Sequence, residues 1–100
     1  MNLRDYIWNI YEIAKTNNVQ RDVAKDMFIA NLNAGTDKYK GATGVSYRRL
    51  GMKWKALSSV EKRKQQEEFH KIITDYFKPL SQAWQAGDRK SFDAVIAGIQ

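Results

Sequence analysis

Positive charge is the main feature of this sequence that could do chemistry. Between Lys38 and Lys64 the chain carries nine basic residues and one acid, Glu61, a net charge of +8, whereas the whole chain carries +6. The basicity is therefore local, and a local excess of Lys and Arg attracts polyanions such as nucleic acids. Together with Tyr47, these residues form our predicted nucleic-acid-binding set: Lys38, Lys40, Tyr47, Arg48, Arg49, Lys53, Lys55, Lys62, Arg63 and Lys64.

The near absence of acids across this segment favours phosphate binding, because the basic side chains have no local carboxylates to pair with. The alternative is an ordinary solvated surface, which is the usual state of a run of charges. Arg48 and Arg49 follow an aromatic residue, a combination that suits forked hydrogen bonds and stacking on a nucleic acid, although both could be plain helix residues.

Catalytic and metal-binding patterns are missing from the sequence. The eleven acids are scattered, and Gly41-Ala42-Thr43-Gly44 lacks the Lys-Ser/Thr that completes a phosphate-binding loop. The chain has no cysteine and a single histidine, His70, which argues against a zinc site and against a disulfide framework. We therefore expect no enzyme activity, no cofactor and no metal.

Apolar periodicity predicts the helices that must position the basic residues. Apolar side chains recur every three or four positions over Leu3–Ala14, which predicts a first helix at about 3–15. After a polar turn, a second apolar stripe starts at Val19 and predicts a helix that ends near Gly35.

The basic segment itself divides into a loop and two helices. Three glycines and no apolar periodicity over 35–44 predict a basic loop that is able to contact a ligand. A third helix is expected over 45–56. Ser58 and Glu61 have the spacing of a capping box, which predicts the start of a fourth helix.

The C-terminal part is the most regular. An apolar stripe runs from Phe69 to Trp84, with Pro79 inside it, so we expect a long helix with a kink or short break near Phe77-Lys78. Gly87-Asp88 ends that helix and caps a fifth. The sequence thus predicts a compact all-α domain over 1–100, with about five helices and no strand.

No apolar run is long enough to span a membrane, and the N-terminus lacks the layout of a secretory signal. We therefore expect a protein that has no membrane partner and is intracellular rather than secreted.

One segment carries a family resemblance. Seven residues, spaced as Leu-Gly-x-x-Trp-x-x-Leu-Ser-x-x-Glu-Lys, match the junction of the second and third helices of an HMG box: Leu50, Gly51, Trp54, Leu57, Ser58, Glu61 and Lys62. Tyr76 falls where the third helix of that family often has an aromatic residue. The resemblance covers 50–76, and the first-helix signature of the family is absent.

The resemblance implies a box-like core at about 20–78 and a helical extension at about 79–100. It also implies a protein that binds the minor groove of double-stranded DNA with little sequence preference and bends the duplex with apolar wedges. By analogy, Met27 and Phe28 are candidate wedges, although core packing is favoured for both. Trp54 is expected to be a core residue rather than a base contact.

Two other functional classes stay open. The chain could be a small basic adaptor or inhibitor, of the kind found in phages and mobile elements, that binds an acidic protein partner. It could also be a structural protein of a nucleoprotein particle. If the DNA-binding prediction holds, a nucleoid or nuclear location follows.

Overall fold

Six α-helices make up the part of the chain that the structure describes. The structure is a computed structural model, and it describes residues 3–41 and 47–99. In chain order the helices are α1 (Leu3–Asn17), α2 (Arg21–Ala34), α3 (Tyr47–Lys55), α4 (Ser59–Asp75), α5 (Phe77–Gln85) and α6 (Arg89–Ile99). No strand occurs within these described ranges, so the predicted all-α class is confirmed.

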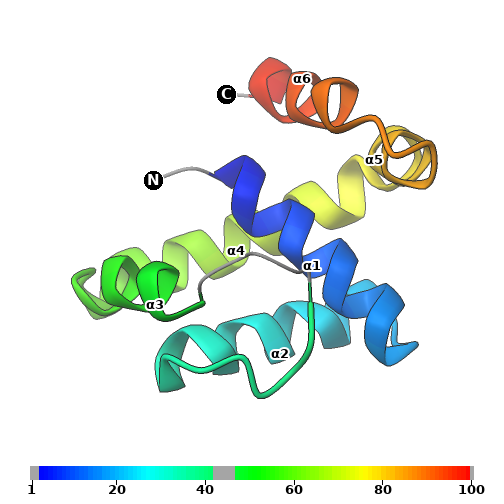
Figure 1. Cartoon of the computed structure of the whole chain (residues 1–100). Helices are drawn as coiled ribbons and strands as arrows, with labels where there is room; N and C mark the ends of the chain where they lie inside the picture. Colours follow the sequence, from blue (N-terminus) through cyan, green and yellow to red (C-terminus); the bar gives the residue numbers. More distant parts are fainter. Residues whose placement is uncertain (1–2, 42–46, 100) are drawn as a thin grey trace.

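Helix α1 lies at the centre of the arrangement. It packs against α2, α4 and α6, and Figure 1 shows it crossing in front of α4 with α2 on one side and α6 on the other. Its buried residues occur on nearly every turn, from Leu3 to Ile13. An N-terminal helix with this much buried surface is therefore part of the core.

All six helices contribute side chains to one apolar core. Its centre is a series of ring contacts: Tyr6 lies 5.5 Å from Phe28 and 5.6 Å from Phe69, measured between ring centroids. Near α6, Tyr11 meets Phe92 edge-on at 5.5 Å. Such tilted and edge-to-face geometries are the favoured arrangements of aromatic pairs.

The long fourth helix predicted from the sequence is divided in two at Tyr76. Pro79 has no N–H to donate to the Asp75 carbonyl, and its ring would collide with that carbonyl in a continuous helix. The chain therefore ends α4 at Asp75 and restarts at Phe77, which places Pro79 in the first turn of α5, where a missing N–H costs little. The predicted break is present, and it raises the helix count from five to six.

Other predicted boundaries agree with the structure. Gly35 ends α2 in the left-handed conformation, with φ of 65°, and its N–H donates to the Asn31 carbonyl. The predicted capping box is present at the start of α4. The predicted start of the third helix at Val45 lies outside the described residues.

Candidate nucleic-acid interface

Trp54 holds the corner between α3 and its neighbours. The side chain is fully buried, and its ring stacks on Phe69 of α4 at a centroid distance of 6.4 Å. Its indole Nε1 donates a hydrogen bond of 2.8 Å to Asn33 Oδ1 at the end of α2. Trp54 is thus a core residue, as expected, and cannot stack on a base.

Gly51 explains the close approach of α3 and α2. A Cβ atom at this position would lie 2.8 Å from the Leu32 carbonyl oxygen and 3.3 Å from the Gly35 Cα, both of them backbone atoms. Only a residue without a side chain allows the two helix backbones to pack at this distance.

The remaining motif residues also have structural roles. Ser58 Oγ accepts a hydrogen bond from the Glu61 N–H at 3.2 Å, and the Glu61 carboxylate accepts one from the Ser58 N–H at 3.4 Å. Leu50 and Leu57 are half-buried against the core. The motif therefore builds a helix corner, and any contact with a nucleic acid must come from the charged residues that the corner presents.

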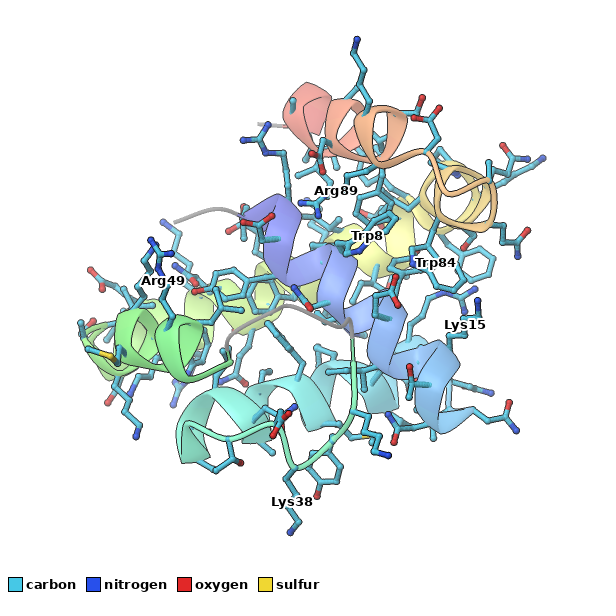
Figure 2. The ribbon with its side chains drawn as sticks, in the orientation of Figure 1. Trp8, Lys15, Lys38, Arg49, Trp84 and Arg89 are labelled. Carbon is cyan, nitrogen blue, oxygen red and sulfur yellow. The ribbon has the colours of Figure 1, made fainter. Side chains whose placement is uncertain are left out.

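The outward face of α3 carries the most concentrated charge. Arg49, Met52 and Lys53 are exposed and spaced three and four apart, so they share one face of the helix. Figure 2 shows Arg49 extending upward from α3. Helix α3 contains no acid. We call Arg49, Met52 and Lys53 the α3 face.

Lys55 lies beside this face. Its Nζ is 3.7 Å from the position that a Cβ atom on Gly35 would take, so the ammonium group sits over the C-terminal end of α2. A cation at a helix C-terminus is stabilised by the helix dipole. Tyr47 and Arg48 were also predicted to bind here, but their side chains lie outside the described residues.

The loop after α2 carries two further cations in a fixed backbone. Asn31 is fully buried; its Nδ2 donates to the Tyr39 carbonyl at 2.8 Å, and its Oδ1 accepts from the Tyr39 N–H at 3.1 Å. Asn17 Nδ2 donates to the Lys40 carbonyl at 2.9 Å. Lys38 and Lys40 are exposed on this loop. In Figure 2, Lys38 points to the opposite side of the view from Arg49.

The three consecutive cations on α4 do not share a face. Successive helix residues differ in direction by about 100°. Accordingly, Arg63 lies near Lys25 of α2, whereas Lys64 lines a hollow that also includes Ile99 of α6. Lys62 is half-buried. The cations of α4 therefore do not form one positive surface.

Most cations of this segment have no carboxylate partner within the described residues. Seven of the predicted binding residues form no ion pair there: Lys38, Lys40, Lys53, Lys55, Lys62, Arg63 and Lys64. Their positive charge stays available to an external anion.

The candidate wedges face the core. Phe28 is fully buried and meets Tyr6 edge-on, and Met27 is half-buried against the same core. Fully buried Phe28 cannot reach a base step, and half-buried Met27 packs against the core, so we leave both residues out of the interface. Sequence reasoning missed Met52, which is 69% exposed on the α3 face. The sequence pattern that could have revealed it is an apolar residue three positions after Arg49, a spacing that places both on one face of a helix.

No family model, curated protein or solved structure matches this chain. Among the described residues, no helix has the length and apolar composition that crossing a membrane requires.

Proposed function

We propose that this protein binds double-stranded DNA with low sequence preference and bends it, and that α2, α3 and α4 form a box-like unit. The observation that carries the proposal is the α3 face, held rigidly by buried Trp54 and free of acidic residues. Lys55 extends the positive surface beside this face, over the C-terminal end of α2. Phosphate contacts from these cations would supply most of the affinity.

Electrostatic binding makes a quantitative prediction about salt. If about four cations contact phosphates, the logarithm of the binding constant should fall with the logarithm of salt concentration with a slope of roughly −4. Fluorescence anisotropy with a labelled duplex, measured over a series of salt concentrations, gives this slope. Affinity that is absent at low salt, or that does not change with salt, would refute the proposal.

Two charge-reversal variants test where on the protein the duplex binds. Lys53→Glu with Lys55→Glu should lower duplex affinity by more than about tenfold and reduce the salt slope by about 2. Lys64→Glu with Lys71→Glu makes the same change in net charge on the side of α4 that faces Ile99. This second variant should lower duplex affinity clearly less than the first. Equal losses of affinity in the two variants would show that only net charge matters.

An acidic protein partner is the second candidate function. The observation that favours it is the exposure of two apolar side chains beside the cations, Met52 at 69% and Val60 at 78%. Apolar residues surrounded by charge are common in protein interfaces. Capture of one specific acidic protein that is lost in the Lys53→Glu and Lys55→Glu variant, with no affinity for duplex DNA, would favour this candidate.

A further inference from the structure

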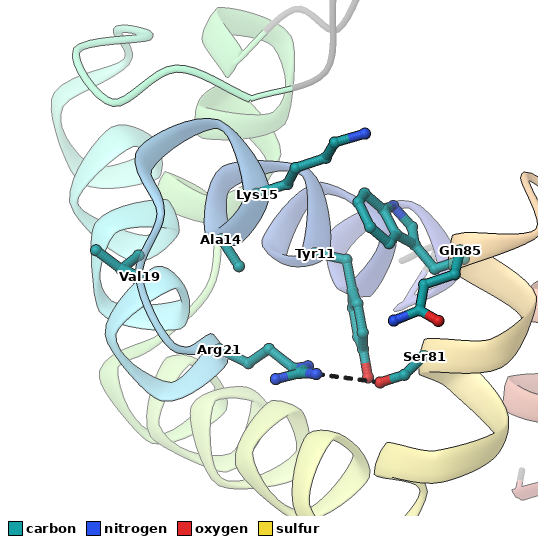
Figure 3. Close-up of a pocket in the computed structure, with 8 residues that line it drawn as sticks. Tyr11, Ala14, Lys15, Val19, Arg21, Ser81 and Gln85 are labelled. Carbon is teal, nitrogen blue, oxygen red and sulfur yellow. Dashed lines mark hydrogen bonds between the residues drawn. The ribbon is translucent and has the colours of Figure 1, made fainter.

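A cavity lies away from the α3 face, between α1, α2 and α5. It has a volume of about 240 Å³ and is lined by residues that include Tyr11, Lys15, Arg21, Ser81 and Trp84. Figure 3 shows these elements around the cavity, and in Figure 2 Lys15 and Trp84 lie on the opposite side of the molecule from Arg49.

Arg21 is held in place within this cavity. Its Nη2 donates to Ser81 Oγ at 3.2 Å, which Figure 3 marks with a dashed line. The guanidinium carbon lies 5.4 Å from the centre of the Tyr11 ring and 4.0 Å from that of Phe77. Arg21 forms no ion pair with any carboxylate of the described residues. A positioned, half-buried guanidinium with its charge not neutralised is a ready anion receptor.

Tyr11 places a buried hydroxyl beside Arg21 and Ser81 at the wall of the cavity. The residue is 3% exposed, and its hydroxyl has no hydrogen-bond partner among the described residues. Figure 3 shows the hydroxyl directed toward Arg21 and Ser81. Burial raises the pKa of this hydroxyl above its usual value, while Ser81 and Arg21 act in the opposite direction. The group therefore stays protonated at neutral pH and can donate to a ligand.

Lys15 adds positive charge to the cavity. The Lys15 ammonium lies 5.1 Å from the centre of the Trp84 ring, at the edge of the cavity. Arg21 is the first residue of α2. The N-cap, Gln20, makes no side-chain hydrogen bond to the helix, but the Asp22 carboxylate accepts from the Val23 N–H at 2.9 Å, so the helix dipole is not counted toward the charge of the cavity. Glu12 lies nearby, but its carboxylate accepts from Trp84 Nε1 at 3.3 Å.

We propose that this cavity binds a small phosphate monoester. Arg21 and Lys15 balance the two negative charges of the phosphate, and the Tyr11 hydroxyl donates to one of its oxygens. The volume is below the range of about 300–1,000 Å³ that is usual for drug-sized ligands, so a compact ligand fits and a nucleic-acid duplex does not. This site is separate from the proposed DNA interface and does not depend on it.

Nuclear magnetic resonance of the intact chain tests the proposal with phenyl phosphate as the probe. The Trp84 indole N–H signal should shift and saturate at millimolar phenyl phosphate, while the signal of buried Trp54 stays unchanged. Lys15→Gln and Tyr11→Phe should each weaken binding by about tenfold, the value of one hydrogen bond to a charged group. Lys71→Gln, the same charge change on an exposed site of α4, should leave binding unchanged.

Lys15 is exposed, so its replacement leaves the fold intact even if the Tyr11 variant unfolds. Three results would overturn the proposal: no saturating shift of the Trp84 signal, equal weakening by Lys71→Gln, or equal affinity for acetate. The first shows that there is no site, the second shows general charge attraction, and the third shows an anion site without preference for phosphate.

Discussion

The indole Nε1 of Trp54 donates to the side-chain oxygen of Asn33 at 2.8 Å and thereby joins α3 to the C-terminal end of α2. Trp54 has no exposed surface, whereas Asn33 is exposed. This hydrogen bond between a core side chain and a surface side chain therefore helps to fix the orientation of α3 relative to the end of α2.

Replacing Asn33 should weaken this corner. Asn33→Ala leaves a buried N–H without its partner, which should lower the free energy of unfolding by about 1–3 kcal/mol. Urea unfolding followed by circular dichroism measures the change. In a Trp54→Phe background, which has no indole N–H, the same Asn33→Ala substitution should cost almost nothing. An equal cost in both backgrounds would show that Asn33 acts through something other than the indole.

Gly51→Ala tests the close packing of α3 on α2. Alanine favours helices by about 1 kcal/mol over glycine, but its Cβ would lie 2.8 Å from the Leu32 carbonyl oxygen. The two atoms nearest to this Cβ, the Leu32 carbonyl oxygen and the Gly35 Cα, belong to the backbone and cannot move aside easily. We therefore expect a net loss of about 1–3 kcal/mol in unfolding free energy. Gly98→Ala is the matched control: a Cβ there meets nothing within 4 Å, and the substitution should be neutral or stabilising. A Gly51→Ala variant as stable as the unaltered protein would show that the backbones of α2 and α3 do not pack this closely.

Helix positions could be predicted from the sequence because their signals are local. The Ser58 and Glu61 capping box, the Gly35 terminus and the break caused by Pro79 all depend on residues within a few positions of one another. The central place of α1 could not be predicted, because amphipathic periodicity shows that a face is buried but does not show which helices cover it.

The candidate site was predictable only in part for the same reason. Net charge along the sequence located the cations, but side-chain direction on a helix separates neighbours such as Arg63 and Lys64. The phosphate cavity had no sequence signal at all. Ser81 is 60 positions from Arg21 and further still from Tyr11, and only the packing of α1, α2 and α5 brings the three together.

Asp88 should make the stability of α6 depend on acidic pH. Its carboxylate accepts from the Ser91 hydroxyl at 2.6 Å and from the Ser91 N–H at 3.0 Å, and these hydrogen bonds lower the pKa of Asp88. Because the pKa is lower in the folded state, the stabilisation is present above about pH 4 and is lost as the pH falls below that value. The melting temperature, measured by circular dichroism over acidic pH, should show this loss.

Ser91→Ala provides the comparison for Asp88. It removes the shorter hydrogen bond but keeps the carboxylate, so the folded-state pKa of Asp88 moves back toward its unfolded value, and the loss of stability at low pH should be smaller than in the unaltered protein. Asp88→Asn should remove this contribution to the pH dependence. Identical pH profiles for all three proteins would show that Asp88 does not couple to folding.

Met52 is the apolar side chain best placed to bend DNA under the proposed function. It is 69% exposed between Arg49 and Lys53, so cations that hold phosphates would bring its thioether side chain against the base steps. Insertion of such a wedge kinks the duplex.

Met52→Ala should therefore reduce bending, measured by energy transfer between dyes at the two ends of a short duplex, while phosphate-based affinity falls only slightly. Val60→Ala removes an exposed apolar side chain from α4 and should leave bending unchanged. Full bending by the Met52→Ala protein would exclude this residue as the wedge, and bending lost equally in both variants would show that neither position is specific.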